Sequence, residues 1–254
     1  MEVYHLPNAL DRKMADALFL HLQQYNKWIQ SSFMGSPTPR LQQWFATSHS
    51  SHSSQAEGEG EAKREDMSYK FGGRRYQPEP YPEWLTTLQT QIIAIVRTFF
   101  SSRGDESFRP PNSVLINKYR DGRDKIQWHT DNNHEFGKDP TIISVNVGQT
   151  RRFCIKPIPL RPGQRVPRSA TKTFHLQHGD ILIMAGTTQE HYVHCVPKET
   201  KLCHAFPCRY NLTFRPYTKT TLPESTRLQS RRLKRKRPAP LAHKTQNSLQ
   251  HSKR

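Results

Sequence analysis

Long apolar runs and cysteines are both scarce in this sequence of 254 residues. No stretch approaches the roughly 18 apolar residues that a membrane-spanning helix needs, and the N-terminus lacks the basic region and long apolar core of a signal peptide. The four cysteines are too few for a disulfide scaffold in a chain of this length, which favours a reduced intracellular setting. We therefore expect a soluble protein that is neither secreted nor bound to a membrane.

Acidic residues are also few, with 21 Asp and Glu against 39 Lys and Arg, which gives a net charge of +18. The residues from Thr218 onward hold 11 of the basic residues and one of the acidic ones, so the rest of the chain is basic without them. An excess of this size favours a polyanionic partner, either nucleic acid or an anionic membrane. Hydrophobic residues make up 33% of the chain, which predicts a packed core together with disordered stretches.

The spacing of apolar residues predicts two amphipathic helices, one over residues 8–30 with Asn8 as its N-cap and one over residues 84–101. After Pro110 and Pro111, short apolar runs separated by turn residues are typical of strands. The predicted strands cover residues 113–119, 141–147, 152–156, 171–176, 180–184, 193–196 and 210–215. Two helices followed by many short strands predict a β-sandwich or jelly roll with the helices on one face.

Two residues with metal-ligand chemistry, His129 and Asp131, lie two positions apart. Alternate residues of a strand point to the same face, so this imidazole and this carboxylate can bind one metal ion. Two His and one carboxylate form the facial triad of non-haem Fe(II) oxygenases. The candidates for the second His are His175, His178, His191, His194 and His204. We favour His194, because it follows an apolar strand and a turn that can return the chain to the site, and His191 is its local competitor.

A second polar set alternates along residues 209–215, where Arg209, Asn211, Thr213 and Arg215 share one parity. Leu212 and Phe214 on the other parity supply a buried face, which indicates that the polar face lines a ligand site. Arg holds a carboxylate through two parallel charge-assisted hydrogen bonds. The two sets together predict an iron enzyme with an acidic co-substrate.

A zinc site is the alternative for the stretch that contains Cys195, Cys203, His204 and Cys208. The spacing of these residues matches no compact zinc knuckle, and cysteines are ordinary in loops. We therefore prefer the iron site.

Three stretches carry a family resemblance: LINKYRDGRDKIQWHTD (residues 115–131), HGDILIMAGTTQEHYVHCVPKE (178–199) and RYNLTFR (209–215). They resemble the AlkB family of Fe(II)/2-oxoglutarate-dependent dioxygenases, the nucleic-acid dealkylases, over about residues 39–216. The match looks most similar to the eukaryotic nuclear DNA-repair branch. The resemblance implies an α+β fold, with a double-stranded β-helix (jelly-roll) core, N-terminal helices and a nucleotide-recognition lid.

The resemblance also implies the residues of the active site. The iron ligands fall on His129, Asp131 and His194. The 2-oxoglutarate contacts fall on Asn117, Tyr119, Arg209 and Arg215, with Asn211 orienting Arg209 or the co-substrate. The implied cofactors are Fe(II), 2-oxoglutarate and O2.

The implied reaction is an oxidative demethylation of damaged or modified bases such as 1-methyladenine and 3-methylcytosine. An Fe(IV)-oxo group hydroxylates the N-linked methyl carbon, and formaldehyde is released. The substrate is DNA, with RNA as a second substrate, and the target base is single-stranded or flipped out of a duplex. The alternative is the same oxygenase core acting on RNA modification or on a protein.

The resemblance places a recognition hairpin at residues 68–73. Phe71 is then the residue that stacks on the flipped base, with Tyr69 beside the site. The candidate phosphate contacts are Arg74, Arg75, Arg151 and Arg152, and a solvated surface charge is the alternative for each of them.

The residues just after Asp131 depart from the family, because Asn132 and Asn133 stand where relatives often carry acidic residues. An amide donates as well as accepts hydrogen bonds, whereas a carboxylate only accepts. Reading of the base edge therefore falls on Asn132, Asn133 or Glu135, and the sequence does not choose among them.

We expect four segments: an N-terminal helical segment (1–46), a flexible linker or loop (47–66), a dioxygenase domain (67–217) with its lid at 67–83, and a disordered basic tail (218–254). The basic run from Arg231 to Arg237 is typical of a nuclear address or a nucleic-acid patch, and a solvated tail is the alternative. We expect a monomer that binds nucleic acid in the nucleus, with the cytoplasm as a second compartment and no membrane partner.

Overall fold

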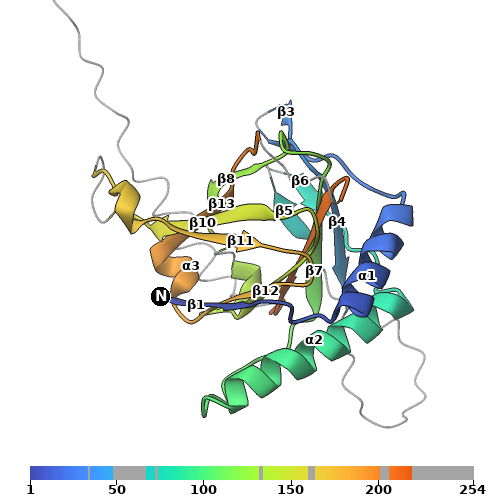
Figure 1. Ribbon diagram of the computed structural model, residues 1–254, viewed down its shortest axis with the longest axis horizontal. Helices are drawn as coiled ribbons and strands as arrows, with labels where there is room; N and C mark the ends of the chain where they lie inside the picture. The colour runs from blue at the N-terminus through green and yellow to red at the C-terminus, as the bar shows by residue number, and fades with distance from the viewer. Residues whose placement is uncertain are drawn as a thin grey trace, which may run out of the picture. The chain divides into compact units, whose positions relative to one another are not determined.

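The computed structural model describes residues 1–33, 35–47, 67–71, 74–131, 134–159, 164–200 and 206–218 (Figure 1). The predicted linker lies outside the described residues except for Thr47, and the predicted basic tail does so except for Thr218. No helix in these ranges is long and apolar enough to cross a membrane.

Two antiparallel sheets dominate the fold (Figure 1). The larger sheet has the strand order β1 (Glu2–Leu6), β12 (Ile181–Ala185), β9 (Ile142–Gly148), β14 (Arg209–Arg215), β7 (Ser113–Tyr119) and β4 (Leu41–Ala46). The smaller sheet has the order β11 (Lys172–Leu176), β10 (Arg151–Pro157), β13 (Tyr192–Val196) and β8 (Ile126–His129). All seven predicted strands are present, with ends shifted by at most one residue.

An apolar layer connects the two sheets. Successive side chains of a strand point to opposite faces, and one parity of the strands in each sheet supplies this layer. Its buried members are Tyr119, Ile142, Phe153, Ile155, Leu176, Leu182, Met184 and Val196. Full burial of one such side chain stabilises a fold by roughly 1.5–3 kcal/mol, so this layer packs the sheets against each other as a jelly roll.

Two helices, α1 (Arg12–Gln24) and α2 (Glu83–Ser101), cover the other face of the large sheet (Figure 1). Their apolar stripes pack against the outward parity of the sheet. The buried residues of this core include Leu18, Phe19 and Leu22 of α1, Leu85, Ile92 and Val96 of α2, and Ile116, Val145, Ile183, Leu212 and Phe214 of the sheet. The helix predicted at residues 84–101 is confirmed.

The start of α1 differs from the prediction. Asp11 caps the helix, because its carboxylate accepts the backbone N–H of Met14 at 2.8 Å. Asn8 precedes the helix with a φ of 51°, and its N–H donates to the carboxylate of Asp180 at 2.9 Å. The predicted N-cap at Asn8 is therefore wrong. Both residue types can cap a helix, and here a contact distant in sequence places Asn8 outside it.

Residues 1–46 supply both edge strands of the large sheet as well as a helix. β1 pairs with β12 from Glu2 opposite Ala185 to Leu6 opposite Ile181, and β4 pairs with β7. Neither these strands nor β8 is predicted from the sequence, because their short runs do not alternate simply between polar and apolar residues. The N-terminal segment is therefore not purely helical.

Short elements complete the described fold. Two small hairpins are formed by β2 (Ser32–Phe33) with β3 (Ser36–Pro37) and by β5 (Tyr69–Phe71) with β6 (Arg74–Tyr76). A single-turn helix, α3 (Thr188–His191), joins β12 to β13, and 3-10 turns cover His134–Phe136 and Arg168–Ala170. The β5–β6 hairpin overlaps residues 68–73, where the resemblance places a recognition hairpin, and extends to Tyr76.

Candidate metal centre and anion site

The candidate metal ligands come from neighbouring strands of the small sheet. His129 is the last residue of β8 and pairs directly with His194 of β13, while Asp131 follows just beyond the strand end. One ligand atom from each of the three lies within 4.8 Å of the others, and the two imidazole centroids are 4.2 Å apart. We call these three residues the metal triad. In the described ranges no other group of His, Cys, Asp or Glu is arranged to share a metal ion.

The protonation states of the metal triad suit metal binding. His129 Nδ1 donates to the carbonyl of Gln127 at 2.8 Å, which leaves the Nε2 lone pair free 3.8 Å from Asp131. Burial lowers the pKa of His194 to about 3 and also lowers the pKa of His129, so both rings are neutral at neutral pH. Burial alone would raise the pKa of Asp131, but the Arg215 guanidinium and the two neighbouring histidines together lower it, so the carboxyl stays ionised.

Three side chains orient the metal triad. The side-chain oxygen of Gln189, in α3, accepts the backbone N–H of Asp131 at 2.9 Å. Arg215 donates to Asp131 Oδ2 from NH2 at 2.9 Å and from Nε at 3.3 Å. The Phe153 ring stacks on His194 with centroids 5.2 Å apart. No motif in the sequence marks Gln189 or Phe153, so neither is predicted from it.

The polar parity of β14 faces the interior, as its alternation predicts. Arg209, Asn211, Thr213 and Arg215 are all buried, while Leu212 and its neighbours on the other parity pack against the helices. Arg209 Nε and NH1 and Arg215 NH1 have no hydrogen-bond partner among the described residues. Buried donors of this kind carry a free-energy penalty until a partner satisfies them. A bound carboxylate would supply that partner in the geometry that guanidinium prefers.

Two of the predicted co-substrate contacts, Tyr119 and Asn211, lie beside Arg209, and we call these three residues the anion site. The Arg209 guanidinium lies 4.9 Å from the centroid of the Tyr119 ring, and these residues are partners in the β14–β7 register. Asn211 Nδ2 donates to Ser144 Oγ at 2.7 Å. Burial lowers the pKa of Arg209 to about 10, which still leaves it cationic at neutral pH.

Asn117 shares the inward parity of β7 with Tyr119 and is buried. Its side-chain oxygen accepts from Arg40 Nε at 2.9 Å and from Gln42 Nε2 at 3.0 Å. The amide is thereby oriented by two residues of the β4 region that the sequence analysis did not single out.

The predicted base contacts are only partly within the described residues. Tyr69 and Phe71 lie on β5, but their side chains are outside the described residues, as is Asn132. Glu135 lies half-buried in the 3-10 turn that follows Asp131. Their roles stay predictions.

Arg151 is not a surface phosphate contact, so that prediction is wrong. Its side chain is 1% exposed. NH1 donates to the carbonyl of Asp121 at 2.9 Å, and NH2 donates to the carbonyls of Asp124 at 2.8 Å and Pro197 at 2.6 Å. Alternate residues of β10 face the interior, so Arg151 points inward like Phe153. Two adjacent arginines in the sequence do not show which of them faces inward.

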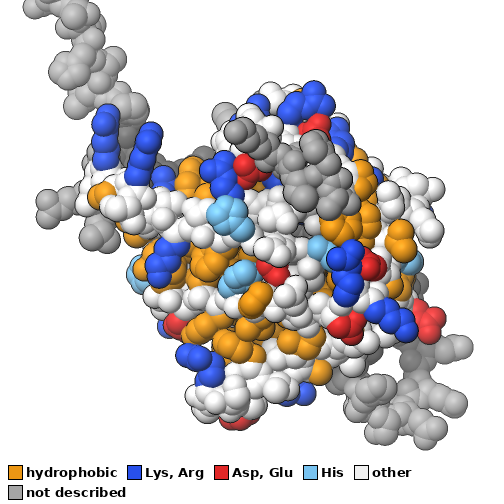
Figure 2. Space-filling view, viewed as in Figure 1, with side chains coloured by type: hydrophobic (Ala, Val, Ile, Leu, Met, Phe, Trp, Pro, Cys, Tyr) orange, Lys and Arg blue, Asp and Glu red, His pale blue; other side chains and the backbone are white. Residues whose placement is uncertain are grey.

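The other predicted phosphate contacts differ among themselves. Arg152 is half-exposed and pairs with Glu199 at 2.7 Å, and Arg75 is exposed and donates to Ser68 Oγ at 2.8 Å. The Arg74 side chain lies outside the described residues. On the face in Figure 2, Lys and Arg side chains are spread over the surface and interspersed with a few acidic ones. Basic character on that face is therefore not confined to one patch.

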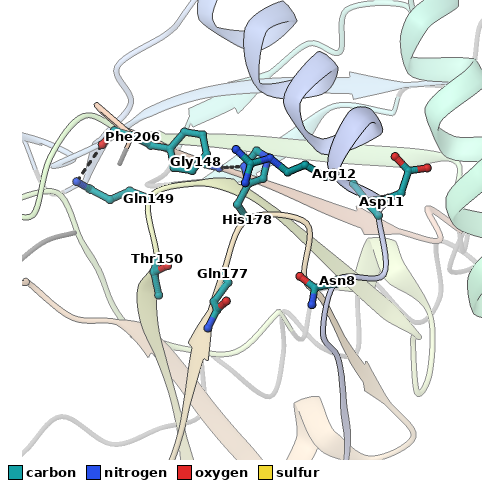
Figure 3. A pocket seen from close by; sticks show the side chains of 10 residues that line it. Asn8, Asp11, Arg12, Gly148, Gln149, Thr150, Gln177, His178 and Phe206 are labelled. Atoms are coloured by element: carbon teal, nitrogen blue, oxygen red, sulfur yellow. Dashed lines mark hydrogen bonds between the residues drawn. The ribbon is translucent and has the colours of Figure 1, made fainter. Parts of the chain in front are cut away.

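The competing histidines within the described residues, His175, His178 and His191, do not share a metal site with the triad, and His204 lies outside those residues. His175 and His191 are exposed. His178 lines a separate cavity of about 330 Å³ beside the start of α1 (Figure 3). Its Nδ1 accepts the N–H of Gly148 at 2.8 Å, and its Nε2 lies 3.1 Å from the carboxylate of Asp16. Both ring nitrogens therefore have their neighbours away from the metal triad.

The alternative zinc site is only partly within the described residues. Cys203 and His204 lie outside them. Cys195 is buried on β13, directly opposite Cys154 of β10, and burial raises its pKa to about 12. A buried neutral thiol is a poor zinc ligand.

Comparison with known proteins identifies the family. The family model described as the 2OG-Fe(II) oxygenase superfamily matches residues 2–215, so this chain belongs to that superfamily. Within it, the chain is 32% identical over 215 residues to the rat protein named "Alpha-ketoglutarate-dependent dioxygenase alkB homolog 3", covering 82% of this chain and 62% of the relative. It is 32% identical over 155 residues to the bovine "DNA oxidative demethylase ALKBH2", covering 61% of this chain and 51% of the relative.

The chain spans about three fifths of the length of the alkB homolog 3 proteins that it matches. Among solved structures, "The structure of OsALKBH1" superposes with a TM-score of 0.56 at 15% identity, covering 85% of this chain and 96% of that chain. This likeness shows the fold alone and confirms the predicted jelly roll. The resemblance to the AlkB family is confirmed by the named relatives.

The residues present fit the cofactors that the superfamily implies, Fe(II) and 2-oxoglutarate with O2. The metal triad offers two neutral imidazoles and one carboxylate, the donor set of non-haem iron sites. The unpaired guanidinium donors of Arg209 and Arg215 offer the complement to a dicarboxylic acid.

Proposed function

We propose that this chain is an Fe(II)/2-oxoglutarate-dependent dioxygenase that removes N-linked methyl groups from bases of DNA, with RNA as a second substrate. The observation that carries the proposal is the metal triad together with the buried, unpaired donors of Arg209. When bound, Fe(II), 2-oxoglutarate and O2 supply the oxidation that hydroxylates the methyl carbon, which then leaves as formaldehyde.

The side chains divide the work in this proposal. The metal triad holds the metal through three ligands and leaves the other positions to co-substrate and oxygen. Arg209 receives the distal carboxylate of 2-oxoglutarate through its free Nε and NH1 donors. Arg215 holds the Asp131 carboxylate in one orientation. The ring of Phe153 covers one side of His194 and excludes water there.

Two observations support nucleic acid as the substrate. Relatives carry the names alkB homolog 3 and DNA oxidative demethylase, and the net charge of +18 favours a polyanion. In the proposal Phe71 of the β5–β6 hairpin stacks on the flipped base, with Tyr69 beside the site. Asn132 or Glu135 then reads its edge, and the protein acts as a monomer.

Demethylation of short oligonucleotides tests the proposal. The panel holds 1-methyladenine, 3-methylcytosine and N6-methyladenine in single- and double-stranded DNA and RNA, each read by mass spectrometry. We expect loss of the methyl group from at least one substrate, with formaldehyde formed in step with it, and no product from the His129→Ala variant. Consumption of 2-oxoglutarate with every oligonucleotide unchanged would contradict a nucleic-acid substrate and favour a protein substrate.

We also propose that the basic run from Arg231 to Arg237 directs the protein to the nucleus, which its composition supports. The test is a fluorescent fusion of the full chain with the six Lys and Arg residues of this run changed to Gln. We expect the wild-type fusion in the nucleus and the variant in the cytoplasm. A nuclear variant would contradict the address, and an unchanged location with weaker oligonucleotide binding would indicate a nucleic-acid patch.

A further inference from the structure

A second buried guanidinium lies close to the anion site. Arg151 and Arg209 are each 1% exposed, and both approach the ring of Tyr119, with centroid distances of 5.6 Å and 4.9 Å. Two buried like charges that share one aromatic neighbour repel each other in a medium that screens them poorly. The fold therefore maintains a local positive charge that calls for an explanation.

The hydrogen bonds of Arg151 hold it in place without neutralising it. Its NH1 and NH2 donate only to backbone carbonyls, those of Asp121, Asp124 and Pro197, and carbonyl dipoles carry no net charge. The nearby Asp121 and Asp124 side chains are paired with other residues, at 2.7 Å to Arg123 and 2.8 Å to Arg120. In the described residues Arg151 thus makes no ion pair, although the carboxylates of Glu199, Asp124 and Asp121 attract its charge from further away.

Arg209 is also without a carboxylate partner in the described residues. Its NH2 donates to the side-chain oxygen of Asn146, and its Nε and NH1 have no hydrogen-bond partner there. The charge of Arg151 contributes to the lowered pKa of Arg209, after the larger effect of burial. The two guanidinium groups therefore act electrostatically as neighbours, and an anion bound to Arg209 would relieve the repulsion between them.

We propose that Arg151 is a positioning residue for the co-substrate, which fixes Tyr119 and adds a second positive charge to the anion site. The proposal rests on the proposed function, because it takes 2-oxoglutarate as the ligand of Arg209. Arg151 does not touch the ligand in this scheme. It favours a 2-oxo acid with a distal carboxylate over one that ends in a methyl group.

A purely structural role makes a different prediction. Arg151 ties the loop after β7, through Asp121 and Asp124, to the end of β13 at Pro197. These two segments flank the strands that carry the histidines of the metal triad. If bracing were its whole role, a substitution would change the binding of every 2-oxo acid equally or would change only stability.

The test compares two ligands on the Mn(II)-loaded protein by calorimetry: 2-oxoglutarate and 2-oxopentanoate, which has the same carbon chain without the distal carboxylate. Arg151→Gln keeps hydrogen-bond donors and removes the charge, and Arg151→Lys keeps the charge and removes the fork. We expect Arg151→Gln to bind 2-oxoglutarate roughly tenfold more weakly and 2-oxopentanoate unchanged. Arg151→Lys is expected to retain most of the discrimination between the two ligands.

Arg152→Gln is the matched control, since this neighbour is half-exposed and paired with Glu199, and we expect it to bind both ligands as the wild type does. Equal weakening of both ligands by Arg151→Gln, or no change in either, would overturn the proposal in favour of bracing alone. Should Arg151→Gln fail to fold, equal weakening of both ligands by Arg151→Lys would overturn it too. If the wild-type protein bound neither 2-oxo acid, the proposed function itself would fail, which distinguishes the two failures.

Discussion

Single buried donors and acceptors determine what this site can bind. His129 uses Nδ1 on a backbone carbonyl and keeps Nε2 free, whereas His178 accepts the Gly148 N–H with Nδ1 and has Nε2 3.1 Å from the Asp16 carboxylate. Two residues of the same type therefore differ in function because their neighbours differ. Arg151 and Arg209 also differ, since Arg151 has NH1 and NH2 on carbonyls and only Nε without a partner, whereas both Nε and NH1 of Arg209 lack one in the described residues.

Asp131→Asn tests the metal triad at one atom. The substitution keeps the shape of the side chain and removes its charge, so we expect affinity for Fe(II) or Mn(II) to fall by more than about 100-fold. Calorimetric titration of the metal measures this. Asp139→Asn, at an exposed carboxylate, is the control and should bind metal normally. A metal affinity that survives Asp131→Asn would remove Asp131 from the ligand set.

His178 makes stability depend on pH in a predictable direction. Burial lowers its pKa, although Asp16 acts in the opposite direction. Below the ordinary His pKa of about 6.5, the unfolded chain binds the proton more readily than the folded one, so stability is full above that pH and is lost as the pH falls below it. Protonation would also remove the lone pair that accepts the Gly148 N–H.

Urea unfolding between pH 7.5 and 5.5 measures this effect. The wild type should lose more stability over this range than His178→Gln, in which the titrating group is absent. His175→Gln, at an exposed position, should follow the wild type. Equal slopes for His178→Gln and the wild type would show that His178 does not contribute.

Among the elements, β14 carries two functions on its two faces. Leu212 and Phe214 belong to the core beneath the helices, and Arg209 and Arg215 face the interior between the sheets. The strand lies between β9 and β7 in the large sheet, so both faces are covered. Its alternation was readable from the sequence, because a period of two depends only on neighbours along the chain.

Substitutions on the two faces of β14 should have separable effects. Leu212→Ala leaves a cavity and should lower the free energy of unfolding by about 2–5 kcal/mol, with the KM for 2-oxoglutarate unchanged in the folded fraction. Arg209→Lys replaces the planar fork by a point charge and should raise that KM roughly tenfold. Denaturant unfolding and initial-rate kinetics measure the two quantities. An unchanged KM for Arg209→Lys would remove this residue from the anion site.

For the molecule as a whole, the N-terminal residues are part of the oxygenase fold. β1 and β4 form the two edges of the large sheet, α1 covers one of its faces, and the match to the superfamily begins at residue 2. Asp180, which lies just before β12, holds the N-terminal segment against the sheet. Its carboxylate accepts from Asn8 N at 2.9 Å and lies 2.8 Å from His5 Nε2. The large sheet therefore contains strands both from the segment that was expected to be helical and from the expected catalytic domain.

Removal of residues 1–46 should therefore prevent folding. The truncation exposes the apolar face of the large sheet and leaves β12 and β7 as open edges. Circular dichroism on heating should show no cooperative transition, whereas a chain that ends at Lys219 should retain one. A cooperative transition in the chain that lacks residues 1–46 would contradict this account of the sheet.

Patterns among residues close in sequence were enough to predict seven strands, the second helix, the pairing of His129 with Asp131 on one face, and the polar face of β14. Each depends on residues that are close in sequence. The packing of distant segments was needed for the rest: the pairing of β1 with β12, the meeting of His194 with His129 across two strands, and the burial of Arg151. Burial is set by what lies opposite a side chain in space, and for Arg151 that is a set of carbonyls 27 to 46 residues away.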